Sequence, residues 1–170
     1  SGIAKVTREN SYVLYQLTGH GESSLESDFT ETLDNSGVTM QDLNLLTTDT
    51  VPEDAAALLI NDPQADLSAL DAAAIKTYLE NGGKVLLTTS GYTETPNLDA
   101  AMAQFGLARE PGLVVEGDTN HYLNGYPALY LLPDYASTEE STALDGVNTS
   151  RRVLLQMAQG ITLTETEHVV

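Results

Sequence analysis

The sequence contains no cysteine and no tryptophan, and only 7 of its 170 residues are lysine or arginine. The absence of cysteine excludes disulfides, thiolate nucleophiles and cysteine-bound zinc. Against the 7 basic residues stand 25 aspartates and glutamates, which gives a formal net charge of −18. A field of this sign repels nucleic acid phosphates and anionic lipid headgroups, so we expect neither as a partner.

Long apolar runs are also absent. No stretch approaches the roughly 20 consecutive apolar residues of a membrane-spanning helix, and no signal peptide is visible. Apolar residues nevertheless make up 41% of the chain, and a chain of this length buries roughly 70% of its unfolded surface. We therefore expect a single α/β domain over residues 1–170, cut from a longer protein.

The hydrophobic pattern alternates between strands and helices. Short apolar runs predict strands, and apolar residues at i, i+4 and i+8 predict helices. Strands are expected at 13–17, 38–46, 55–60, 84–89, 113–116, 128–132 and 161–163, and helices at 25–36, 69–81 and 97–105, with either type at 151–158. Three successive strand–helix units predict a three-layer α/β fold with a mainly parallel sheet flanked by helices, of the flavodoxin-like kind.

The most informative local feature is the turn Thr-Gly-His-Gly-Glu, which follows the first predicted strand. Gly19 and Gly21 permit backbone angles closed to other residues and place His20 and Glu22 at the lip of the sheet. Ligands of open α/β folds bind at this lip, beyond the carboxyl ends of the strands. We predict a ligand-binding cluster there, formed by Gly19, His20, Gly21, Glu22, Asp62, Gln64 and Ser90. The alternative is that the turn is structural, with His20 and Glu22 bonded to neighbouring loops.

Two other interpretations, nucleotide binding and hydrolysis, are weaker. The first turn is one glycine short of a dinucleotide-binding motif, because Ser24 takes the third glycine's place, and no P-loop exists. A hydrolase would use Ser90 as nucleophile and His20 as base, oriented by Glu22 or Asp62, but Thr88 stands where a nucleophile elbow needs its first glycine. Neither interpretation predicts a cofactor, and we expect none.

The histidines are too dispersed to predict a metal site. His20, His121 and His168 lie far apart in the sequence. Weak hard-cation sites at Asp62 with Asp66, or at Asp118 with His121, are expected by chance in so acidic a chain. We therefore predict no metal. Four tyrosines either form a surface that binds carbohydrate or peptide, or pack a long loop onto the sheet: Tyr122, Tyr126, Tyr130 and Tyr135.

Several motifs together carry a family resemblance. They are the Thr18–Glu22 turn, Asp-Pro-Gln-Ala-Asp-Leu-Ser at 62–68, Tyr-Leu-Glu-Asn-Gly-Gly-Lys at 78–84, Thr-Pro-Asn-Leu at 95–98 and Phe-Gly at 105–106. With the Ile-Ala-Lys-Val-Thr segment at 3–7, this series resembles the extracytoplasmic domain of gliding-motility-type (GldG-like) ABC transporter auxiliary proteins. The resemblance covers roughly residues 3 to 133.

The resemblance implies a fold related to class I glutamine amidotransferases, also found in an intraflagellar-transport protein, but without that enzyme class's cysteine nucleophile. It implies a non-catalytic binding or scaffolding domain held outside the membrane beside an ABC transporter permease, anchored through segments outside this chain. A small ligand is compatible with this role. The alternatives are a hydrolase using Ser90 and His20, and a carbohydrate-binding module.

Overall fold

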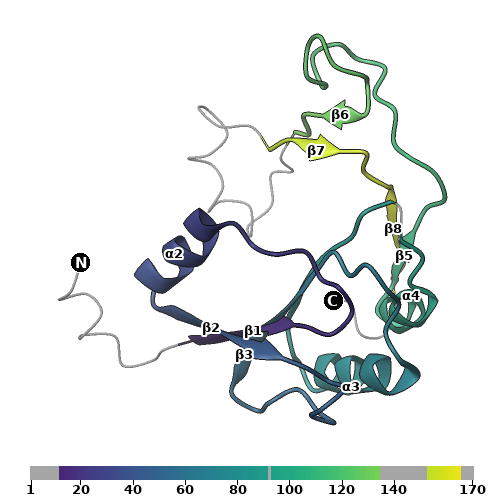
Figure 1. The fold of residues 1–170 in the computed structure, drawn as a ribbon. Coiled ribbons are helices and arrows are strands. Elements are labelled where there is room, and N and C mark those ends of the chain that lie inside the picture. Colours follow the sequence, from purple (N-terminus) through teal and green to yellow (C-terminus); the bar gives the residue numbers. More distant parts are fainter. Residues whose placement is uncertain (1–11, 92, 135–152, 166–170) are drawn as a thin grey trace. The chain divides into compact units, whose positions relative to one another are not determined.

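The computed structural model describes residues 12–91, 93–134 and 153–165. Its centre is a four-stranded parallel sheet in the order β2-β1-β3-β4 (Figure 1). The strands are β1 (Tyr12–Leu17), β2 (Val38–Leu43), β3 (Ala55–Asn61) and β4 (Val85–Thr88). The predicted parallel sheet with flanking helices is confirmed.

Strand position in the sheet follows the apolar pattern. The run Leu58-Leu59-Ile60 in β3 is buried throughout, as a central strand covered on both faces requires. The edge strand β4 instead alternates between partly buried and exposed residues, with Val85 and Leu87 packed against the core and Leu86 exposed. This alternation is typical of a strand with one face turned to solvent.

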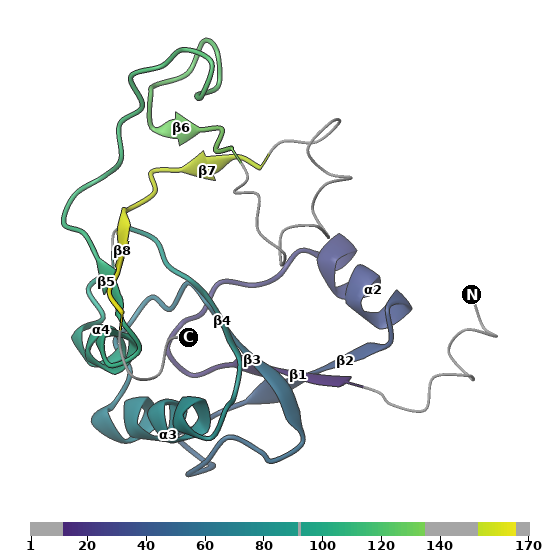
Figure 2. The ribbon, with the colours of Figure 1, turned by 180° about the vertical axis from the view of Figure 1, so that it is seen from behind.

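Three helices flank the sheet: α2 (Ser27–Asn35), α3 (Ala69–Glu80) and α4 (Pro96–Ala103). Helices α3 and α4 pack beside each other on one face, and α2 lies on the opposite side (Figures 1 and 2). Ser68 begins α3 with a capping box, in which its hydroxyl accepts the Asp71 N–H and the Asp71 carboxylate accepts the Ser68 N–H. Helix α2 instead begins after Glu26 without a side-chain cap.

The core lies between the sheet and the α3–α4 pair. It combines residues of β1, β2 and β3 with the inner faces of both helices; its fully buried members include Leu17, Leu58, Ile60, Leu67, Ile75 and Leu98. At its margin the Tyr15 hydroxyl donates to Asp54 Oδ1 over 3.1 Å and ties the β2–β3 connection to the sheet. Burial raises the pKa of Tyr15, and the bond to Asp54 adds to that effect.

The described residues fall into two compact units, which divide between Ala108 and Arg109 and again between Thr162 and Leu163. The expectation of a single domain over residues 1–170 stays a prediction. Two small two-stranded sheets pair β5 (Leu107–Arg109) with β8 (Ile161–Leu163), and β6 (Tyr130–Leu131) with β7 (Leu155–Gln156). None of the described helices is both long enough and apolar enough to cross a membrane.

The strand predicted at 113–116 is wrong. These residues are irregular and largely exposed, although their N–H groups reach other loops, Val114 to the Ala158 carbonyl and Glu116 to the Ala128 carbonyl. The strand expected at 128–132 shortens to the two residues of β6. Val114 and Val115 are β-branched, but a lone apolar run of this length has no partner strand in the described chain, and strand preference depends on such a partner.

Two leucine-sized side chains on α3 provide a matched test of the core. Ile75 is completely buried and Leu70 is 81% exposed. We expect Ile75→Ala to lower the free energy of unfolding by about 2–5 kcal/mol, because it leaves a cavity. Leu70→Ala should change it by less than about 0.5 kcal/mol. Urea unfolding of both variants checks this, and equal losses would contradict the placement of the α3 inner face.

Candidate functional site

The candidate site begins where β1 ends. The Thr18 N–H donates to the Leu43 carbonyl of β2 over 2.9 Å, and the chain then turns through Gly19 (φ 113°) and Gly21 (φ 74°). Only glycine adopts these angles without strain. A Cβ on Gly19 would also lie 3.3 Å from Asn44 Oδ1. The two glycines therefore allow the tight turn that directs the His20 side chain inward.

His20 is 5% exposed, and both of its ring nitrogens face carboxylates. Nδ1 lies 3.0 Å from Glu22 Oε1, and Nε2 lies 3.0 Å from Asp71 Oδ2. The side chains of Glu22 and Asp71 are themselves almost inaccessible to solvent. Because carboxylates only accept hydrogen bonds, both contacts are made together when each ring nitrogen carries a hydrogen. The imidazole thus joins two buried acids.

The same residues hold the turn through its backbone. The His20 N–H donates to Glu22 Oε2 over 2.9 Å, and the His20 carbonyl accepts the N–H groups of Gln64 and Ala65 over 3.0 and 2.9 Å. Asp71 belongs to the capping box of α3, where the helix dipole favours a negative charge. The turn after β1 is therefore bonded both to the loop after β3 and to the first turn of α3.

Asp62 joins the ends of three strands. Its Oδ1 accepts the Ser90 N–H over 2.7 Å, and its Oδ2 accepts the Ser23 hydroxyl over 3.0 Å and the Gln64 side-chain N–H over 2.8 Å. Asp62 adopts φ 50°, a left-handed conformation that aspartate tolerates better than most residues. Its carboxylate is engaged on both oxygens by groups from the loops after β1, β3 and β4.

Asp66 caps the start of α4. Its carboxylate accepts the N–H groups of Asn97 and Leu98 in the first turn of that helix, at 3.1 and 3.4 Å. The Asn97 side chain returns a bond to the Leu67 carbonyl over 2.8 Å. Asp66, from the β3–α3 loop, therefore supplies the side-chain cap that the N-cap residue of α4, Thr95, does not make.

All seven predicted site residues come together at the carboxyl ends of β1, β3 and β4. Four belong to the turn after β1, Asp62 and Gln64 follow β3, and Ser90 follows β4. Their polar groups are largely bonded to one another. Gly21 and Gln64 are exposed at this lip, whereas the His20 ring is buried and directed toward α3. Ligand binding by this cluster stays a prediction.

Sequence reasoning missed Asp71 and the capping role of Asp66. The spacing Ser68-x-x-Asp71 is a capping-box pattern, which marks the start of α3. Leu67, Asp71 and Ile75 also follow at i, i+4 and i+8, and all three are buried. An acid at an apolar-face position signals a buried partner, because an unpaired buried charge is costly. The partner itself is set by the tertiary fold.

His121 is an exposed counterpart of His20. Its Nδ1 lies 3.4 Å from Asp118 Oδ2 and its Nε2 lies 3.1 Å from Asp134 Oδ2, but the ring is 37% exposed. The backbone N–H of Asn120 lowers the pKa of Asp118 below its ordinary value, and the Asn120 side chain and His121 act in the same direction. Within the described ranges, no three acidic or histidine side chains are grouped to hold a metal ion.

The tyrosine stretch combines packing and exposure. Tyr122 forms an isolated bridge with Leu131, and Tyr130 lies within β6. Tyr126 is 54% exposed, and its ring centroid lies 5.2 Å from that of Tyr130 at a tilted angle. Tyr135, the fourth member, lies outside the described residues. One ring of the three described ones is thus mainly open to solvent.

The comparison with family profiles gives a match over residues 12–124 to the family described as "ABC-type uncharacterized transport system". This span includes the whole interlocked cluster at the strand ends. The chain belongs to this ABC-type transport system family. The comparison with curated proteins gave no match.

The family member's fold is also found in a solved structure titled "mmIFT52 N-terminal domain". The two superpose with a TM-score of 0.64 over 90% of this chain and 69% of the other, at 14% sequence identity. At this level of identity the superposition establishes a shared fold and no more. It agrees with the fold expected from the sequence motifs.

The two histidines of this family member give a matched test of burial. We expect His20→Ala to lower the free energy of unfolding by about 3–5 kcal/mol, because it leaves Glu22 and Asp71 buried without their partner. His121→Ala should cost less than about 1 kcal/mol, since its carboxylates stay hydrated. Chemical unfolding of both variants measures the difference. Similar costs would contradict the buried geometry.

Asp118 gives a pH test. Its folded-state pKa is lowered, so its contribution to stability is present above the ordinary aspartate pKa and is lost as pH falls through the lowered folded value. A carboxyl titration followed by NMR should place Asp118 below the ordinary value. Asn120→Ala removes the side-chain donor but keeps the backbone N–H, so it should return the pKa only part of the way. An ordinary Asp118 titration in the unmodified chain would contradict the described turn.

Proposed function

We propose that the chain is a non-catalytic, extracytoplasmic binding or scaffolding domain of an ABC-type transport system auxiliary protein. The observation that carries the proposal is the hydrogen bonding of the histidine and the acids that could otherwise take part in catalysis. His20 is bonded to Glu22 and Asp71, and Asp71 also belongs to the capping box of α3. Asp62 accepts the Ser90 N–H and side-chain groups of Ser23 and Gln64. Their hydrogen-bonding capacity serves to interlock three strand ends with α3.

The hydrolase alternative lacks its base in this arrangement. A serine nucleophile needs a histidine nitrogen within about 2.6–3.2 Å, or somewhat farther without substrate. Both His20 nitrogens are instead engaged by Glu22 and Asp71, and Ser90 reaches the cluster through its backbone N–H to Asp62. Freeing His20 for catalysis would leave two buried carboxylates unpaired, at a cost of several kcal/mol.

Membership of the transport-system family supports a protein partner within that system. We propose that this partner is the permease, and that the domain is held on the extracytoplasmic side by segments outside this chain. The strongly acidic, cysteine-free composition suits exposure to an oxidising exterior. A small ligand at the lip would contact the exposed Gly21 and Gln64 rather than the His20 ring.

The test is co-purification from native membranes. The full-length protein, tagged in its own cell, should co-purify with the permease after mild cross-linking, and an in-frame deletion of the family-matched residues 12–124 should abolish this. The matched control is a full-length protein with Glu31→Lys, a change at an exposed position of α2 that we expect to leave the fold intact. The abundance of the deleted protein in the membrane is measured as well. A fall in this abundance would indicate misfolding and not a specific loss of the permease contact.

Undiminished recovery of the permease after the deletion would overturn the scaffolding proposal. The enzymatic alternative is tested in parallel with Ser90→Ala, which keeps the backbone N–H that Asp62 binds. Ester- or amide-hydrolysing activity that is lost in this variant, with unchanged thermal stability, would replace the proposal by a hydrolase.

A further inference from the structure

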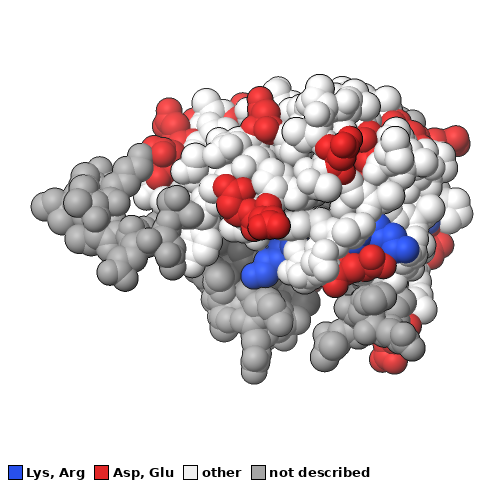
Figure 3. Space-filling model, turned by 90° about the horizontal axis from the view of Figure 1, so that it is seen from below, with Lys and Arg blue, Asp and Glu red and all other residues white. Residues whose placement is uncertain are grey.

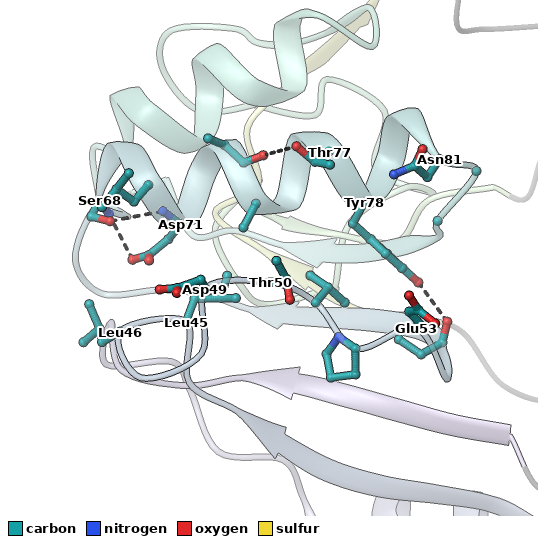
Figure 4. A pocket seen from close by; sticks show the side chains of 18 residues that line it. Leu45, Leu46, Asp49, Thr50, Glu53, Ser68, Asp71, Thr77, Tyr78 and Asn81 are labelled. Carbon is teal, nitrogen blue, oxygen red and sulfur yellow. Dashed lines mark hydrogen bonds between the residues drawn. The ribbon is translucent and has the colours of Figure 1, made fainter.

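A groove runs along α3 on the side facing the connection between β2 and β3. Its volume is about 920 Å³, and its lining residues lie within 45–83 (Figure 4). One wall is the helix from Ser68 to Tyr78, and the other is the loop that carries Leu46, Asp49 and Glu53. The groove is separate from the lip of the sheet, although Asp71 borders both.

The groove walls expose apolar side chains. Leu70 on the helix is 81% exposed and Leu46 on the loop is 61% exposed, and Val51, Ala73 and Ala74 line the space between. The opposite face of α3 already buries Ala72 and Ile75 in the core. Exposed apolar side chains gathered in one concave surface indicate an interaction site more strongly than the same residues scattered singly.

Hydrogen bonds within the chain hold both walls of the groove. The Tyr15–Asp54 bond fixes one end of the loop, and Asn44 fixes the other by accepting the Leu46 N–H over 2.9 Å. Tyr78 crosses from α3 and donates to the Ala55 carbonyl over 3.3 Å. A Cβ on Gly83 would lie 2.5 Å from the Tyr78 ring, so the ring packs directly on that glycine. A preformed surface of this kind loses little conformational freedom on binding.

The charge of the groove is of one sign. Its described lining includes the carboxylates of Asp49 and Glu53 and contains no lysine or arginine. In Figure 4 Glu53 lies at the Tyr78 end and Asp49 toward the Ser68 end. The neighbouring Lys76 on α3 is paired with Glu80 over 3.5 Å. Acidic side chains also predominate over basic ones on the face drawn in Figure 3. A cationic occupant complements this surface.

We propose that the groove binds an amphipathic, lysine- or arginine-bearing segment of a partner protein. Apolar residues of that segment would pack on Leu46 and Leu70, and its basic side chains would face Asp49 and Glu53. The α3 wall from Ser68 to Asn81 is roughly 20 Å long, which accommodates about three to four turns of helix. The assignment of this partner to the transport system rests on the proposed function; the groove chemistry does not.

The test uses the 170-residue chain and a fluorescent amphipathic peptide of about 14 residues, with leucine on one helical face and lysine on the other. Its leucine–glutamate counterpart is the charge control. Leu70→Ser should weaken binding about tenfold, because it removes apolar contact area. Glu53→Lys and Asp49→Lys should each weaken it by about fivefold. Circular dichroism checks that each variant is folded.

Two matched controls separate the groove from the general acidity of the chain. Leu163 is 77% exposed and lies outside the groove lining, so Leu163→Ser should leave binding unchanged. Glu31→Lys makes the same charge change on α2 and should also have little effect. Equal weakening by Glu31→Lys and Glu53→Lys would reduce the interaction to non-specific attraction and overturn the proposal. So would full binding by the Leu70→Ser variant.

Sedimentation of the chain alone gives the remaining outcome. A dimer that Leu70→Ser dissociates would make a second copy the occupant and overturn the assignment to a basic segment. Peptide binding as predicted, combined with failure of the permease to co-purify, would contradict the proposed transport partner while leaving the groove assignment in place.

Discussion

The buried contact of His20 with Glu22 and Asp71 is the interaction on which the rest of the strand-end architecture depends. It connects the turn after β1 to the start of α3, two segments 51 residues apart in sequence. The histidine donates to both carboxylates at once, provided that both ring nitrogens carry hydrogens. Removal of any one member leaves buried charge behind, which makes the contact difficult to change one residue at a time.

The geometry of a parallel sheet explains why such bonds accumulate at this edge. Loops after β1, β3 and β4 all leave the sheet on the same side, and each carries backbone groups that need partners. Asp62 satisfies groups from all three loops, and Asp66 caps α4 from a distance. The acids most suggestive of chemistry in the sequence therefore act as caps and links between loops. That is the physical reason to favour a binding or scaffolding role over catalysis.

Sequence patterning predicted the sheet, its helices and the convergence of the seven lip residues, because these follow from local periodicity and from the common direction of parallel strands. It could not predict which way the His20 ring points, since Asp71 reaches it only through the packing of α3. It also failed at 113–116, where β-branched residues without a partner strand stay irregular. The groove beside α3 was not predicted, because its walls come from two segments, the loop with Leu46 and the helix with Leu70, that only the fold brings together.

Native-state hydrogen exchange at the amides of Gln64 and Ala65 tests the central claim most directly. Both N–H groups donate to the His20 carbonyl. If the turn is part of the interlocked core, these amides exchange only with global unfolding, at the same free energy as amides of the central strand β3. Exchange orders of magnitude faster than in β3, through local opening of the turn, would contradict the account and indicate a mobile loop.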